Sequence, residues 1–280
     1  MITSRTNDVG RQVVAESCQG RDGMKYLRQL VARADQVRRL GESSYAISIL
    51  ERYTKGFNSW SLGSPIPARP IWDTALFECS VLAEASYFLA AHGFYEQACA
   101  LLRGLLDGFL VRLHWDTLHK RGKLKQWTEA GRTTNNYWEW ESGRARTYPT
   151  LRNIWRTVLG EDRVRRYDEL YGLRSEVDEE LATLSRFVHG RPRTRHYPGA
   201  SRSSLCNIEF RKQHFDEWYG HLRTTYCLVS VLSVLQYPDL LGTPGGKEFT
   251  ALESEVAARM ASTLGLASAH EAGQGDSGSV

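Results

Sequence analysis

A histidine followed by closely spaced arginines is the part of the sequence best suited to chemistry. The segment Leu184-Ser185-Arg186-Phe187-Val188-His189-Gly190-Arg191 ends a long helical pattern with His189 and opens an arginine-rich loop. An imidazole gains and loses a proton near neutral pH, and guanidinium groups hold phosphate through paired hydrogen bonds. Together these groups have the capacities that cleavage of RNA without a metal ion requires.

Other polar side chains accompany His189. Ser185 precedes it by four residues, so the two side chains can meet on one helix face. Arg186 points away from the predicted apolar face, toward a partner subunit or toward water. His189 also has a purely structural interpretation, because a helix C-terminus stabilises a histidine. The loop beyond it holds a cluster of cations, interpreted either as an RNA-binding surface or as a solvated one: Arg191, Arg193, Arg195 and His196.

A second polar feature lies in the most apolar helical segment, residues 95–118. Its amino-terminal part contains three charges, Glu96, Arg103 and Asp107, whose spacings of seven and four place them on one seam. Charge inside a bundle is costly unless it is paired, so we expect Arg103 to pair with Asp107 or with another helix. The pair either fixes helix register or shares a polar cleft with His189, where arginine would stabilise charge on a phosphate.

The elements that must position these groups follow from apolar spacings of three and four, and no alternation of period two is sustained. Residues 119–148 interrupt this pattern with an aromatic-rich insertion. The sequence therefore predicts an all-α protein, a helical bundle with this insertion between two core helices. The expected helices are 73–93, 95–118, 149–160, 162–189 and 211–236.

Three stretches follow along the chain. Residues 1–70 are predicted to hold an N-terminal helical segment and a non-helical linker over residues 59–70, which contains Pro65, Pro67 and Pro70. Residues 71–240 form the bundle, and residues 241–280 a short helix and a disordered Gly/Ser-rich tail.

Composition restricts the function classes. Lys and Arg total 36 against 32 Asp and Glu, a net charge of +4, so only local clusters of charge can indicate nucleic acid. The five cysteines are far apart and are predicted to be reduced thiols in a cytoplasmic protein. We expect no metal and no cofactor, since no Cys/His spacing fits zinc, and no membrane span, since no apolar run approaches about 20 residues.

The insertion adds aromatic side chains of open purpose. Trp138 and Trp140 lie near Arg144 and Arg146 in the sequence. Aromatic side chains beside cations can stack the bases of single-stranded RNA. They can equally pack the insertion against the bundle.

At this point the chain resembles the HEPN superfamily, helical bundles found in prokaryotic toxins, CRISPR-associated ribonucleases and phage-defence proteins. The resemblance rests on Ala-x-x-Leu-Leu-Arg-Gly-Leu-Leu-Asp (98–107) and on Leu-Ser-Arg-Phe-Val-His-Gly (184–190), and it covers about residues 73–236. It implies a metal-independent endoribonuclease in which a ribose 2′-hydroxyl attacks its own phosphate, His189 transfers a proton and an arginine holds the phosphate. It also implies a homodimer and a partner protein in a toxin or defence system.

One departure from the family pattern bears on catalysis. Members that cut RNA carry R-x(4–6)-H, whereas the corresponding positions here are Ala182, Thr183 and Leu184. Either Arg186 or Arg103 substitutes for the missing arginine, or the site does not cleave. Two other classes therefore stay open: a non-catalytic module that binds RNA, a nucleotide or a partner protein, such as an antitoxin or scaffold, and an enzyme acting on a small molecule in the bundle cleft.

Overall fold

Helices packed around a large apolar core make up the protein. The computed structural model describes residues 47–62, 70–129, 132–145, 148–188 and 211–265, with scattered positions between 28 and 39. The longer helices are α2 (Ile47–Leu62), α3 (Pro70–Ala91), α4 (Tyr95–Lys120), α6 (Leu151–Val158), α7 (Asp162–Tyr171), α8 (Leu173–Val188), α9 (Lys212–Gln236), α10 (Pro244–Leu252) and α11 (Ser254–Thr263). The short elements are β1 (Gln126–Glu129), β2 (Arg132–Asn135), α5 (Asn136–Glu141) and the 3₁₀ helix η2 (Pro238–Gly242). The predicted all-α bundle is confirmed.

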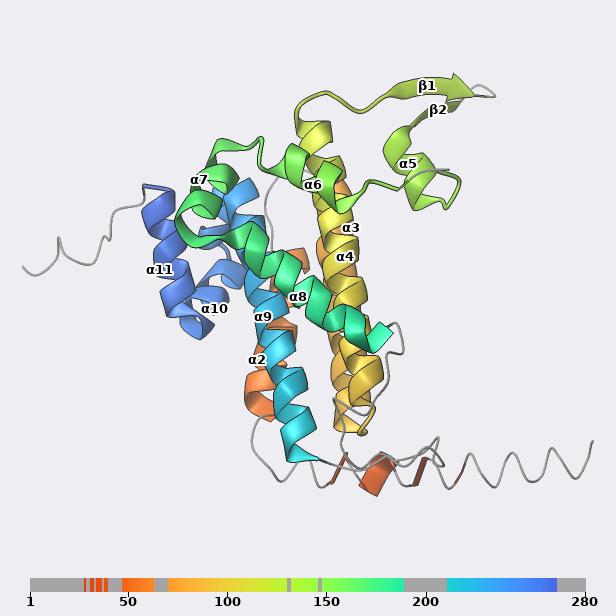
Figure 1. The fold of residues 1–280 in the computed structure, drawn as a ribbon, viewed down its shortest axis with the longest axis vertical. Coiled ribbons are helices and arrows are strands. Elements are labelled where there is room, and N and C mark those ends of the chain that lie inside the picture. Colours follow the sequence, from red (N-terminus) through yellow and green to blue (C-terminus); the bar gives the residue numbers. More distant parts are fainter. Residues whose placement is uncertain are drawn as a thin grey trace, which may run out of the picture.

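Helix α4 is the centre of the bundle. It lies along α3, and α8 begins over α9 and crosses α4 (Figure 1). Buried side chains extend well beyond one face, from Leu102 and Phe109 to Leu110, His114 and Trp115, while Gln97 and Gly104 are exposed. The predicted burial on several sides is therefore confirmed. Any charge on such a helix therefore has to find a partner.

The helix expected over residues 162–189 is two helices, which corrects the prediction. Gly172 adopts a left-handed conformation with φ of 69° and ends α7, and its N–H donates to the carbonyl of Asp168 at 2.7 Å. A glycine takes this conformation without the strain of a Cβ, which is why it terminates helices. Helix α8 then starts at Leu173 and runs in its own direction across α4 (Figure 1).

The apolar core extends from α2 to the carboxy-terminal helices. Trp60 of α2 packs near Phe249 of α10, with ring centroids 6.5 Å apart, and Phe249 also packs near Tyr226 of α9. The core is therefore continuous across the predicted boundaries near residues 70 and 240. Residues 59–62, which we expected outside a helix, form the last turn of α2, because a proline at 65 restricts only its immediate neighbours. The predicted disordered tail from residue 267 lies outside the described residues.

The insertion between α4 and α6 contains a β-hairpin that the sequence analysis did not predict. Strands β1 and β2 pair antiparallel and have four residues each, too few for an alternating pattern to be recognised. Helix α5 follows, with the side chain of Asn135 accepting a hydrogen bond from the N–H of Trp138. Tyr137 is buried against Ile71 and Trp115 and attaches the insertion to the bundle.

One described helix has the length and composition of a membrane span, contrary to the expectation from sequence. This is the segment Ile71–Ala91 of α3. It packs Trp72, Leu76, Cys79 and Ala83 into the core against α2 and α4. Burial inside the bundle accounts for only part of its apolar character, because 39% of the span is buried and Phe77, Val81 and Phe88 are exposed.

Candidate functional site

The contact between α4 and α8 joins three side chains that the sequence singled out. Arg103 of α4 forms an ion pair with Asp107, one turn further along the same helix. The Nε of Arg103 donates a hydrogen bond of 3.0 Å to the Oγ of Ser185 on α8. Ser185 in turn donates to the carbonyl of Leu181 at 2.6 Å. The predicted pairing of Arg103 with Asp107 is confirmed, and the seam of α4 faces the helix that leads toward His189.

Burial differs within this cluster. The Arg103 side chain is 21% exposed and the Asp107 side chain 50% exposed, whereas the Nη1 atom of Arg103 that Asp107 contacts is buried. Burial lowers the pKa of Arg103, although a guanidinium keeps its charge at any physiological pH. The proton of the Ser185 hydroxyl is engaged with Leu181. Ser185 therefore orients Arg103 and offers no free proton to a ligand.

The rest of the predicted α8 flank does not join this cluster. Asp178 accepts a hydrogen bond of 2.9 Å from Nε1 of Trp155 on α6, and its other oxygen lies 3.6 Å from Arg174. Arg186 is exposed and has no ion pair or hydrogen bond with the described part of the chain. Several predicted site residues lie outside the described residues: His189, Arg191, Arg193, Arg195 and His196.

The two tryptophans singled out in the insertion differ in exposure: Trp138 is exposed, and Trp140 is packed against the bundle. Trp138 is 50% exposed. Trp140 packs on the bundle, with the guanidinium of Arg112 5.1 Å from its ring centroid. Arg112 is itself held by Glu78 at 2.6 Å and by Glu141 at 3.2 Å. Packing thus accounts for Trp140, while the face of Trp138 is open to solvent.

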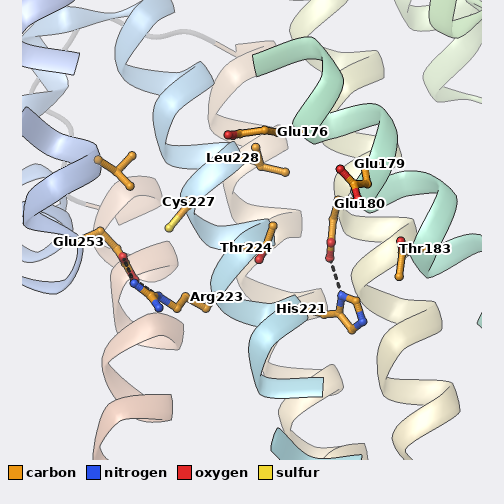
Figure 2. A pocket seen from close by; sticks show the side chains of 11 residues that line it. Glu176, Glu179, Glu180, Thr183, His221, Arg223, Thr224, Cys227, Leu228 and Glu253 are labelled. Atoms are coloured by element: carbon orange, nitrogen blue, oxygen red, sulfur yellow. Dashed lines mark hydrogen bonds and ion pairs between the residues drawn. The ribbon is translucent and has the colours of Figure 1, made fainter. Parts of the chain in front are cut away.

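On its other side, α8 forms one wall of a cavity of about 430 Å³, which we call the α8–α9 groove (Figure 2). Helix α9 is the floor, and the junction of α10 and α11 is the opposite wall. Sites for small organic molecules commonly have volumes of about 300–1,000 Å³. The side chains that line the groove are Glu176, Glu179, Glu180 and Thr183 of α8, His221, Arg223, Thr224, Cys227 and Leu228 of α9, and Glu253 and Val256 at the junction.

A buried imidazole–carboxylate pair lies at one end of the groove. The Nδ1 of His221 is 2.9 Å from Oε1 of Glu180, and their side chains are only 14% and 9% exposed. The ring of Phe187 covers His221, with centroids 6.0 Å apart. A buried polar group requires a hydrogen-bond partner, and each of these two side chains supplies one for the other. The pair thus places an imidazole and a carboxyl group from two different helices at this end of the groove.

Arg223 of α9 and Glu253 at the α10–α11 junction form an ion pair on the opposite wall of the groove. Arg223 donates two hydrogen bonds, of 2.7 and 2.8 Å, to the carboxylate of Glu253, and Tyr53 of α2 donates a third at 2.5 Å. Burial raises the pKa of Glu253, but the hydrogen bonds from Arg223 and Tyr53 outweigh it, so the pKa lies below its ordinary value. The carboxylate stays ionised and joins α2, α9 and the junction. Glu253 thus takes up the Nε–H and one Nη2–H of Arg223 and neutralises its positive charge.

Two carboxylates of the groove lack such partners. Glu176 and Glu179 form no ion pair or hydrogen bond with any residue that the structure describes. Desolvation raises the pKa of Glu176, only partly opposed by Arg259. With Glu180 they give the α8 wall an excess of negative charge. No group of three metal-ligating side chains with the geometry for an ion occurs among the described residues.

Sequence reasoning missed the α8–α9 groove. One signal was present: Glu176, Glu179, Glu180 and Thr183 have the three- and four-residue spacing of one helix face. Nothing in the sequence, however, indicates that this face meets His221, because that depends on the angle at which α8 crosses α9. Searches of protein families, of curated proteins and of solved structures find no match to this chain.

Proposed function

We propose that this chain is an HEPN-like, RNA-directed protein whose site lies at the α4–α8 contact. One observation carries the proposal: the hydrogen bond from Arg103 to Ser185 attaches a guanidinium of the central helix to α8, four residues before His189 in the sequence. These are the two elements on which the family resemblance rests. Their contact supports the pairing of an arginine with a histidine that metal-independent RNA cleavage requires.

The geometry of Arg103 suits a phosphate ligand. Ser185 holds its Nε, and the half-exposed Asp107 contacts its buried Nη1. A phosphate can replace Asp107 as the partner of the fork, because both are oxygen acceptors that guanidinium binds through paired hydrogen bonds. Arg103 would then stabilise the charge that develops on the phosphate.

The reaction follows from these roles. The ribose 2′-oxygen forms a bond to phosphorus while the bond from phosphorus to the 5′-oxygen of the next nucleotide breaks. His189 accepts the proton of the 2′-hydroxyl or gives a proton to the departing 5′-oxygen. The products are a 2′,3′-cyclic phosphate and a 5′-hydroxyl, so atoms and charge balance without a further reactant.

Trp138 would serve a different part of an RNA. Helix α5 lies beside Arg112, which is nine residues beyond Arg103, or about 14 Å along α4. Trp138 therefore cannot contact the nucleotide that Arg103 holds, but its exposed ring can stack a base several nucleotides away.

The internal pairing of Arg103 with Asp107 favours a second candidate, a non-catalytic binding module. Its guanidinium already has an internal carboxylate partner, and the R-x(4–6)-H spacing is absent. In this alternative the same surface binds RNA or a partner protein without cutting. The homodimer, the toxin or defence context and the cytoplasmic location that the resemblance implies remain predictions.

Incubation with labelled RNA in the presence of EDTA tests the proposal. We expect the wild-type chain to produce fragments that end in a 2′,3′-cyclic phosphate, and to leave DNA of the same sequence intact. His189→Ala should slow cleavage by about 100-fold or more, the usual contribution of a general acid or base. Arg103→Gln should slow it comparably.

Arg166→Gln is the matched control, because Arg166 is an exposed arginine on α7. Its cleavage rate should equal that of the wild type. An RNA pool that stays intact with every variant would contradict the catalytic proposal. If wild type and His189→Ala then retain RNA equally well, the non-catalytic module is supported instead.

A further inference from the structure

We propose that the α8–α9 groove binds a small organic cation that carries two amino groups joined by a short aliphatic chain. The inference does not depend on the RNA-directed function, because the groove lies on the other side of α8 from Arg103. It rests on a cavity, on a buried polar pair that opens into it, and on the charge that its walls leave unbalanced.

Glu180 supplies the first anchoring point. Its carboxylate is 9% exposed, and the contact with His221 uses Oε1. The groove lining as a whole holds four glutamates and one arginine, so negative charge exceeds positive charge around Glu180. An ammonium group in the groove would provide the missing positive charge and a charge-assisted hydrogen bond to the remaining oxygen.

Glu176 supplies the second anchoring point. It lies one turn before Glu180 on the same face of α8, at a distance of about 6 Å along the helix axis. Desolvation raises its pKa, so a cation beside it would stabilise the ionised form. A chain of about four methylene groups spans one helical turn, which matches two terminal amino groups to the two carboxylates.

The space between the two anchors is suited to methylene groups. Leu228 of α9 and Val256 of α11 line the groove with apolar side chains. Leu228 lies beside Glu176, and Thr224 lies one turn from it along α9 (Figure 2). Burial raises the pKa of the Cys227 thiol to about 12, so this side chain is a neutral part of the lining. An aliphatic chain can therefore lie on α9 while its ends reach toward α8.

The same walls disfavour other ligands. An anion would meet Glu176, Glu179 and Glu180, and the one arginine among the lining residues, Arg223, is occupied by Glu253. RNA phosphates would be repelled for the same reason. A single metal ion is not favoured by the part of the chain described, which contains no group of three ligating side chains placed to hold one.

Isothermal titration calorimetry with the full chain at constant ionic strength tests the inference. The probes are 1,4-diaminobutane, the monoamine butylamine and the neutral 1,4-butanediol. We expect 1,4-diaminobutane to bind saturably and at least about tenfold more tightly than butylamine, since it gains a second charge-assisted hydrogen bond. The diol should give no saturable heat.

Glu180→Gln should weaken binding of 1,4-diaminobutane by about tenfold or more, while Glu176→Gln should remove the preference for the diamine over the monoamine. Glu169→Gln is the matched control, because it removes an exposed carboxylate of α7 outside the groove. If circular dichroism shows that Glu180→Gln is unfolded, the double variant Glu176→Gln/Glu179→Gln replaces it, since both side chains are exposed.

Three results would overturn the inference: no saturable binding of 1,4-diaminobutane, equal affinity for the diamine and butylamine in the wild type, or an equal loss in Glu169→Gln. The last would show a response to overall charge alone. None of these bears on RNA cleavage, so the two proposals fail separately.

Discussion

The two sides of α8 use charge in opposite ways. Toward α4, Arg103 is matched by Asp107 and by Ser185, and the polar groups satisfy one another within the protein. Toward α9, the groove is lined by Glu176 and Glu179, which no described residue pairs, beside a single imidazole–carboxylate pair. Both sides are polar, but only the second leaves charge unbalanced.

This difference separates polar groups that hold the fold from those that are available to a ligand. Removing one partner of a satisfied pair leaves the other without its hydrogen bond and lowers stability. Removing one of several like charges lowers repulsion and leaves the unliganded fold unharmed. The stability of substituted chains can therefore distinguish the two sides of α8 without any ligand.

Leu184→Ala should lower the stability of the fold more than any other substitution proposed here. It should disturb both sides of α8 at once, so that they can no longer be compared. Leu184 is fully buried on α8 and belongs to the core on which both sides depend. Loss of its side chain should lower the free energy of unfolding by about 3 kcal/mol. Urea unfolding measures this, with the exposed Leu170→Ala on α7 as the control that should stay within about 0.5 kcal/mol. A cost below about 1 kcal/mol would mean that α8 is not anchored at Leu184.

Arg103→Gln should have an intermediate effect on the free energy of unfolding. It tests whether the polar groups on the α4 side of α8 stabilise the fold. It removes the ion pair with Asp107 and the hydrogen bond to Ser185, so we expect a loss of about 1 kcal/mol in the free energy of unfolding. Ser185→Ala added to this variant should cost less than in the wild type, because the shared interaction is already gone. Strictly additive costs in this double-mutant cycle would show that the two side chains are not coupled.

Glu176→Gln should change the free energy of unfolding least. Whether the variant is more or less stable than the wild type tests the α9 side of the comparison. The pKa of Glu176 is raised above its ordinary value of 4.5, so the ionised side chain is disfavoured in the folded protein. Its contribution to stability is therefore present at acid pH and lost as the pH rises through the raised pKa. The variant should exceed the wild type by less than about 0.5 kcal/mol at pH 7 and equal it near pH 3.

The measurement is urea unfolding at both pH values. Glu169→Gln provides the comparison, because Glu169 is exposed outside the groove. A loss of stability in Glu176→Gln at pH 7 would mean that Glu176 has a stabilising partner, and would remove the contrast between the two sides of α8.

Much of the helical architecture could be predicted because it depends on local periodicity. The buried character of α4 follows from apolar residues that extend well beyond one face of residues 95–118, and the pairing of Arg103 with Asp107 follows from a spacing of four. The break at Gly172 was missed because an apolar spacing of three and four continues across it, and a glycine inside a helical pattern does not always end a helix. The short hairpin was missed because strands of four residues show too little alternation.

The sequence by itself determined which helix faces are polar, since that depends on the period of the α-helix alone. Only the tertiary structure decided which of these faces meet. The crossing of α8 over α4 and α9 brings Ser185 to Arg103 and Glu180 to His221, contacts between residues 82 and 41 positions apart. Such contacts depend on how side chains interlock between helices. The periodicity of a single helix contains no information about the angle and register of that packing.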